Sequence, residues 1–269
     1  MAGSSTLIGI VIQMTIVLAL VITAAVYLLR KERIALKPML IGALVFLLFS
    51  QVLEKGLHVY MLQLNPVTAA WLQHAWLFAT YGALAAGVFE ELGRYVAFRW
   101  WLKRRRSWGD GLSFGLGHSG VEALLIGVVG GAQMLALAVM YNNGTLQQKL
   151  GGLPPETAEA LVAGLSGTPL HLYVLGGVER IAAFLLHLAF SIMVLQGVRS
   201  RRFHYVLAAI GLHAAVDFVP ALYQAKAVSV YAAEAVVVLA GIAGFMYLRR
   251  MKKNDSREWL PESDGEKRS

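Results

Sequence analysis

Seven long apolar stretches dominate this sequence and constrain its fold more than any other feature. They cover residues 7–29, 39–60, 68–98, 112–141, 170–198, 203–222 and 228–248. Each is at least as long as the roughly 20 residues that an α-helix needs to cross a bilayer. Only 15% of the residues are charged, whereas soluble domains carry about 25%. The sequence therefore predicts an all-α, polytopic membrane protein, and it excludes a soluble enzyme, a disordered chain and a transmembrane β-barrel.

The basic residues of the loops predict how the helices are oriented. Sixteen Lys and Arg residues follow the first, third, fifth and seventh stretches, and the opposite side has only Lys55, Lys149 and Lys226. Because basic loops stay in the cytoplasm, we expect the N-terminus outside and the C-terminus inside. The regular alternation of the basic loops also supports the count of seven spans.

The seven spans are expected to form one transmembrane domain over residues 1–250, with the functional helices between about 68 and 222. The first stretch should be an uncleaved span, since no basic residue precedes it and a basic run follows it. The external loop 142–169 should contain a short surface helix, which PPETAEALVAGL indicates. Residues 251–269 are polar and mixed in charge, which predicts a disordered cytoplasmic tail.

The net charge of +8 and the absence of cysteine narrow the chemistry further. In a membrane protein, an excess of basic residues indicates loops that face anionic lipid, so we expect the bilayer and no nucleic acid as a partner. Without cysteine, the chain has no disulfide, thiolate metal site or cysteine nucleophile. We expect a multi-pass protein of the cell membrane of a prokaryote.

Ionisable side chains inside the predicted spans are the strongest functional signal, because charge in a bilayer is costly. They occur in the segments FEELGR, FGLGHSGVE, ERIAAFLLH and HAAVD. At 1.5 Å of rise per residue, Glu90, His118, His187 and His213 lie about 9–18 Å from the cytoplasmic ends of their helices. These helices alternate in direction, yet their polar groups reach one depth. The convergence predicts a single buried site on the cytoplasmic side of the midplane.

The spacing of these residues suits metal-assisted hydrolysis. The pairs separated by four residues, which share a helix face, are His118 with Glu122, His213 with Asp217, and Glu90 with Arg94. Two or three imidazoles and a carboxylate can hold zinc and leave a position for water. A separate glutamate is then available as the general base.

Each of these residues also has a structural interpretation. A lone histidine in a membrane often forms an interhelical hydrogen bond, and Glu90 and Glu91 could form an ion pair with Arg94. We assign a structural role to Glu179 and Arg180, which lie farther outward. The remaining histidines are given a structural role as well: His58, His74, His171 and His204.

Together, these motifs resemble the YhfC family of intramembrane metalloproteases, which is related to the CAAX-protease and PrsW groups. The resemblance rests on EELGR, on FGLGH followed by VE, on a histidine in the next span and on HAAVD, between about residues 88 and 220. The CAAX-type motif is EExxxR, whereas Arg94 comes one residue earlier here. The last motif ends in Asp217 where that group has Asn. Both departures argue against prenylated CAAX substrates.

The resemblance implies a role for each matching residue. Glu90 or Glu91 would activate water, and we expect Glu90. Arg94 would keep the second glutamate ionised or stabilise developing negative charge, and Asp217 would orient a histidine. The residues expected to hold a divalent metal, most simply zinc, are His118, Glu122, His187 and His213.

The predicted function is therefore the hydrolysis of a peptide bond in a membrane-associated protein or peptide. Three alternatives remain open. A proton- or ion-coupled transporter also uses buried Glu, His and Asp, although its polar groups would extend from one membrane surface to the other. A membrane cytochrome with two histidine ligands would leave the Glu pair unexplained. A catalytically silent scaffold is the third.

Overall fold

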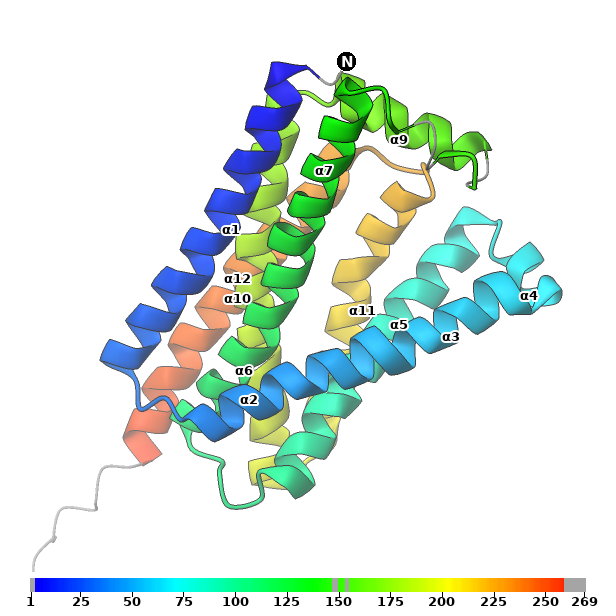
Figure 1. The fold of residues 1–269 in the computed structure, drawn as a ribbon. Helices are drawn as coiled ribbons and strands as arrows, with labels where there is room; N and C mark the ends of the chain where they lie inside the picture. The colour runs from blue at the N-terminus through cyan, green and yellow to red at the C-terminus, as the bar shows by residue number, and fades with distance from the viewer. Residues whose placement is uncertain (1–2, 147–149, 153–154, 259–269) are drawn as a thin grey trace, which may run out of the picture.

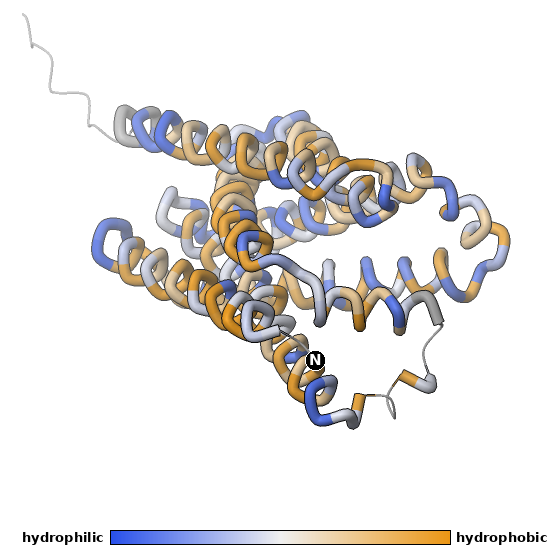
Figure 2. The backbone as a smooth tube through the Cα atoms, turned by 90° about the horizontal axis from the view of Figure 1, so that it is seen from above, coloured by the Kyte–Doolittle hydropathy of each residue, from blue (hydrophilic) through white to orange (hydrophobic). Residues whose placement is uncertain are grey.

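The computed structural model describes residues 3–146, 150–152 and 155–258, and these residues form helices and no strand. The prediction of an all-α protein is therefore confirmed. Figure 1 shows long helices packed side by side, with the start of α1 and the end of α12 at opposite ends of the molecule. Figure 2 shows that hydrophobic residues run along most of these helices.

Several of the long helices combine α-helical segments with wider π-helical ones, labelled η. The elements are, in chain order, α1 (Ser4–Lys31), α2 (Leu36–Val45), η1 (Phe46–Glu54), α3 (Lys55–Val59), η2 (Tyr60–Leu64), α4 (Pro66–Trp71), α5 (Ala75–Val96), η3 (Ala97–Trp101), α6 (Trp108–Ala123), η4 (Leu124–Val129), α7 (Gly130–Asn142), α9 (Pro155–Gly167), α10 (Leu170–Ser200), α11 (His204–Gln224) and α12 (Val230–Glu258).

Within the described residues, six helices are long and apolar enough to cross a membrane. They are Ser4–Lys31, Leu36–Leu64, Trp108–Asn142, Leu170–Ser200, His204–Gln224 and Val230–Lys253. The third predicted span corresponds to α5, which has 22 residues but is not one of the six. Glu90, Glu91 and Arg94 lower its hydropathy. The count of seven spans and the orientation of the termini stay predictions.

Helix α10 lies at the centre of the bundle. In its apolar span 72% of the residues are buried, against 17–28% in the other five. It packs against α1, α6, α11 and α12, so it can present residues to several neighbours at once. The outer helices instead expose large apolar side chains, such as Ile22, Leu40 and Leu239, as expected for surfaces that face lipid.

Glycines bring α2 and α6 into backbone contact. A Cβ atom on Gly42 would lie 2.0 Å from the carbonyl oxygen of Phe114, and one on Gly117 would lie 1.8 Å from that of Met39. Close approach through small residues is typical of helix packing in membranes. Since Gly117 precedes His118, this contact also sets the position of that histidine.

Two further predictions concern the loop 142–169 and the segment that follows residue 250. The short helix expected in that loop is present as α9, so that prediction is confirmed. Helix α12 continues to Glu258, and the predicted disorder therefore does not apply to residues 251–258. There, Asp255 accepts a hydrogen bond of 2.7 Å from Arg199 of α10, and Lys252 contacts Glu32. Residues 259–269 lie outside the described residues.

Candidate active site

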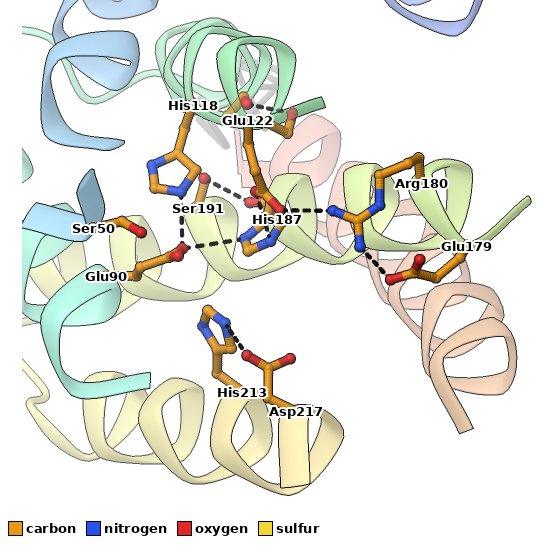
Figure 3. Close-up of polar contacts among 12 residues, drawn as sticks. Ser50, Glu90, His118, Glu122, Glu179, Arg180, His187, Ser191, His213 and Asp217 are labelled. Carbon is orange, nitrogen blue, oxygen red and sulfur yellow. Dashed lines mark hydrogen bonds and ion pairs between the residues drawn. The ribbon is translucent and has the colours of Figure 1, made fainter. Parts of the chain in front are cut away.

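Four helices bring the polar residues of the sequence motifs together at the centre of the bundle (Figure 3). Helix α5 carries the Glu pair and Arg94, α6 carries His118 and Glu122, and α11 carries His213 and Asp217. His187 comes from the central helix α10. All of these residues are buried except Asp217. The convergence expected from helix depth is thus present in the fold.

One group of side chains has the spacing that a metal ion requires. The donor atoms of Glu90, His118, Glu122 and His187 all lie within 4.8 Å of one another. Oε2 of Glu90 lies 2.9 Å from Nε2 of His118, and Oε2 of Glu122 lies 2.9 Å from Nε2 of His187. Two imidazoles and two carboxylates suit zinc and related divalent ions.

The contacts at His118 test whether this group fits a cation. Its Nε2 atom lies 2.8 Å from the guanidinium of Arg94 and 2.9 Å from the carboxylate of Glu90. An imidazole nitrogen offers either a lone pair or a proton, so it cannot accept from Arg94 and donate to Glu90 at the same time. An imidazole that gives its Nε2 lone pair to a cation needs no proton donor at that atom, so a cation held by this group would remove the conflict once Arg94 gives up its contacts with His118 and His187. The residues therefore fit a divalent metal.

Arg94 and Glu91 form an enclosed ion pair behind this group. Neither side chain is exposed, and the Arg94 guanidinium contacts both Glu91 and Glu90. It also approaches Nδ1 of His187 at 2.7 Å. Arg94 thus supplies the positive charge that two adjacent buried carboxylates need.

His213 lies beside the metal-capable group and does not belong to it. Its Nδ1 atom lies 2.8 Å from Glu91, and its Nε2 atom lies 3.3 Å from Asp217. Its ring stacks on Phe190 with the centroids 5.1 Å apart. Both ring nitrogens of His213 already face a carboxylate. The fourth member of the metal-capable group is Glu90, whereas the sequence predicted His213 in that position. The ligand role predicted for His213 stays a prediction that the geometry does not favour.

A cavity of about 430 Å³ reaches the site from one side. The predicted site residues on its wall are Glu90, Glu122, His187, His213 and Asp217. Glu91, Arg94 and His118 lie behind that wall. The two adjacent glutamates therefore differ sharply, because only Glu90 can meet water or a ligand in the cavity.

Other polar residues line the same cavity, and none of them was predicted as a site residue. Arg180 lies 3.4 Å from Glu122 and also contacts Glu179. Glu54, His58 and Tyr81 line the cavity as well, and Nδ1 of His58 lies 2.8 Å from the Tyr81 hydroxyl. A usable signal was present in the sequence, since Glu54 and His58 are four residues apart in a predicted span, the same spacing as the motif pairs. Among the other histidines, His171 contacts Tyr231 at 2.9 Å.

Apolar helices that enclose a cavity lined by histidines and carboxylates, with donors spaced for a metal ion, define a membrane protein with an intramembrane metal-capable site. The chain belongs to the YhfC intramembrane metalloprotease family, which matches residues 16–238. It is also 37% identical over 244 residues to the membrane protein YhfC of Bacillus subtilis (strain 168), covering 90% of this chain and 94% of the relative. No solved structure matches the chain significantly. The family predicted from the motifs is thus confirmed.

Proposed function

We propose that this protein is a metal-dependent peptidase that cleaves a membrane-associated protein or peptide within the bilayer. The observation that carries the proposal is the cavity, which gives access to Glu90, Glu122 and His187 inside a bundle of apolar helices. The family relationship supports the same reaction. The protein would lie in the cell membrane of a prokaryote, and the loop charges predict that its C-terminus is in the cytoplasm.

A divalent ion, zinc by preference, would be held by His118, Glu122 and His187, which leaves Glu90, the fourth member of the metal-capable group, for a separate role. When bound, such an ion polarises a peptide carbonyl and lowers the pKa of water. His187 is well placed for this role because it contacts both Glu90 and Glu122. Arg180 would fix the orientation of the Glu122 carboxylate from the other side.

Glu90 would act as the general base that takes a proton from the attacking water. It lines the cavity, and its carboxylate lies within 4 Å of His118 and His187. Glu91 would instead hold His213 through Nδ1, while Arg94 balances both glutamates. Asp217 would orient His213 from the cavity, where the imidazole could donate a proton to the leaving amine.

The test is cleavage of a mixture of synthetic peptides by purified protein in lipid vesicles, with products identified by mass spectrometry. A general base contributes about 10²–10⁴ in rate, so Glu90→Gln should lose that much activity while its unfolding temperature stays close to that of wild type. Glu159→Gln removes an exposed carboxylate on α9 and should change nothing. Equal cleavage by wild type and Glu90→Gln would refute the assignment of the base.

A further inference from the structure

A second polar cluster lines the cavity at a distance from the candidate active site. Glu54 ends the π-helical segment η1, and its Oε1 atom lies 3.3 Å from Nε2 of His58. The other ring nitrogen of His58 lies 2.8 Å from the hydroxyl of Tyr81 on α5. All three residues line the same cavity as Glu90. We call Glu54, His58 and Tyr81 the outer cluster.

Glu54 is the residue of the outer cluster that lacks a sufficient partner. It is only 8% exposed, and its Oε2 atom is buried with no hydrogen-bond partner among the described residues. Among the described residues, the one ion-pairing group that contacts Glu54 is the His58 imidazole. A buried carboxylate oxygen without a donor is costly. In addition, π-helical segments are rare and occur frequently at functional sites.

The carboxylates at the other end of the cavity are better compensated. Glu90 contacts Arg94, while Glu122 and Glu179 both contact Arg180. The guanidinium groups of Arg94 and Arg180 thus serve the inner end of the cavity, and no Lys or Arg among the described residues forms an ion pair with the outer cluster. A ligand that brings its own cation would supply both the missing charge and the missing donor for Glu54.

We propose that the outer cluster is a binding subsite for a cationic group of the peptide substrate, either a Lys or Arg side chain or a free α-amino group. Glu54 would pair with the cation, and His58 and Tyr81 would hold the carboxylate in place. This inference rests on the proposed peptidase function and adds a specificity to it.

The position of the cation along the substrate follows from the helix geometry. Tyr81 precedes Glu90 by nine residues on α5, which corresponds to about 14 Å of helix. An extended peptide covers at most about 3.3–3.6 Å per residue. The cationic group should therefore lie about four residues from the bond that is cleaved.

Cleavage of synthetic peptides with Lys, norleucine or Glu at each position, with free or acetylated N-termini, tests the subsite. Wild type should prefer Lys over norleucine by about tenfold or more at the expected position, as for a hydrogen bond to a charged group. Glu54→Gln should bring that ratio close to one, and Glu54→Lys should make Glu the preferred residue. Loss of the preference on acetylation alone would identify the α-amino group as the cation. Ratios that are the same in wild type and both variants would overturn the proposal.

A binding measurement separates failure of the subsite from failure of the peptidase function. If wild type cleaves no peptide, the proposed function is wrong, and the subsite is then judged by n-butylguanidinium with n-butanol as its uncharged control. The guanidinium compound should raise the unfolding temperature of wild type and Glu159→Gln more than that of Glu54→Gln, and Tyr81→Phe should show an intermediate rise. Equal shifts in all four proteins would overturn the subsite.

Discussion

The enclosed side and the cavity side of the polar cluster use the same kinds of residues for different purposes. The enclosed side consists of Glu91, Arg94 and His118, all of which have 0% exposure. On the cavity side, Glu90 and His187 are 6% and 7% exposed and line the cavity. The difference is small in area, but it decides whether a group can meet water and substrate.

Burial of charge within a bilayer does not by itself identify a catalytic residue. Glu90 and Glu91 are neighbours on α5, and both contact Arg94. Because successive residues of a helix point about 100° apart, one glutamate faces the cavity and the other faces α11. We therefore expect Glu91 and Arg94 to stabilise the fold, His118 to hold the metal from the enclosed side, and the cavity side to meet water and substrate.

The largest expected effect is on the enclosed side, with Arg94→Met. Removal of one partner of a buried ion pair costs about 3–5 kcal/mol, and this change leaves Glu91 without its cation. Thermal unfolding in detergent should show a large loss of stability. Arg99→Met removes an exposed guanidinium from the same helix and is the matched control. If Arg94→Met unfolds at the wild-type temperature, the enclosed side is not structural.

The second prediction concerns which histidine holds the metal. His118→Asn removes a donor of the metal-capable group, so it should weaken divalent-ion binding by more than the roughly 10–100-fold that an outer-shell change costs. His213→Asn should weaken it by no more than that amount. Zinc titration against a competing chelator would measure both. Equal and complete loss in the two variants would support the ligand set predicted from the sequence, which includes His213.

A third, smaller effect is expected at the backbone contact that positions His118. Gly117→Ala would place a methyl group against the carbonyl oxygen of Met39. Overpacking of this kind typically costs about 1–3 kcal/mol, so the unfolding temperature should fall. Gly211→Ala is the control, because a Cβ there meets nothing within 4 Å. A fully stable Gly117→Ala protein would mean that α2 and α6 can separate without cost.

The smallest effect is expected for Asp217→Asn on the cavity side. The Asp217 side chain is 40% exposed, and exposed ion pairs contribute at most about 1 kcal/mol to stability. Cleavage should nevertheless fall by about tenfold, equivalent to about 1.4 kcal/mol, because His213 loses one of the two carboxylates that orient it. Unfolding temperature and cleavage rate would be measured on the same preparation. A large loss of stability with normal cleavage would place Asp217 with the enclosed side.

The sequence by itself determined the class of protein and the helices that carry the site. Apolar runs of membrane-spanning length predict helices because the backbone must bond to itself in lipid. The spacing of four residues in pairs such as His118 and Glu122 predicts a shared helix face. Both signals are local, and each can be recognised without knowledge of the neighbouring helices. The motifs together also indicated the family.

Only the tertiary structure decided which polar residues share a cavity. The packing of α5 against α11 and of α6 against α10 turns Glu90 toward the cavity and Glu91 away from it. The same packing places His213 outside the metal-capable group and brings Glu54 and His58 to the cavity wall. Those outcomes depend on the relative rotation and distance of helices far apart in the chain, and no periodicity within a single helix encodes them.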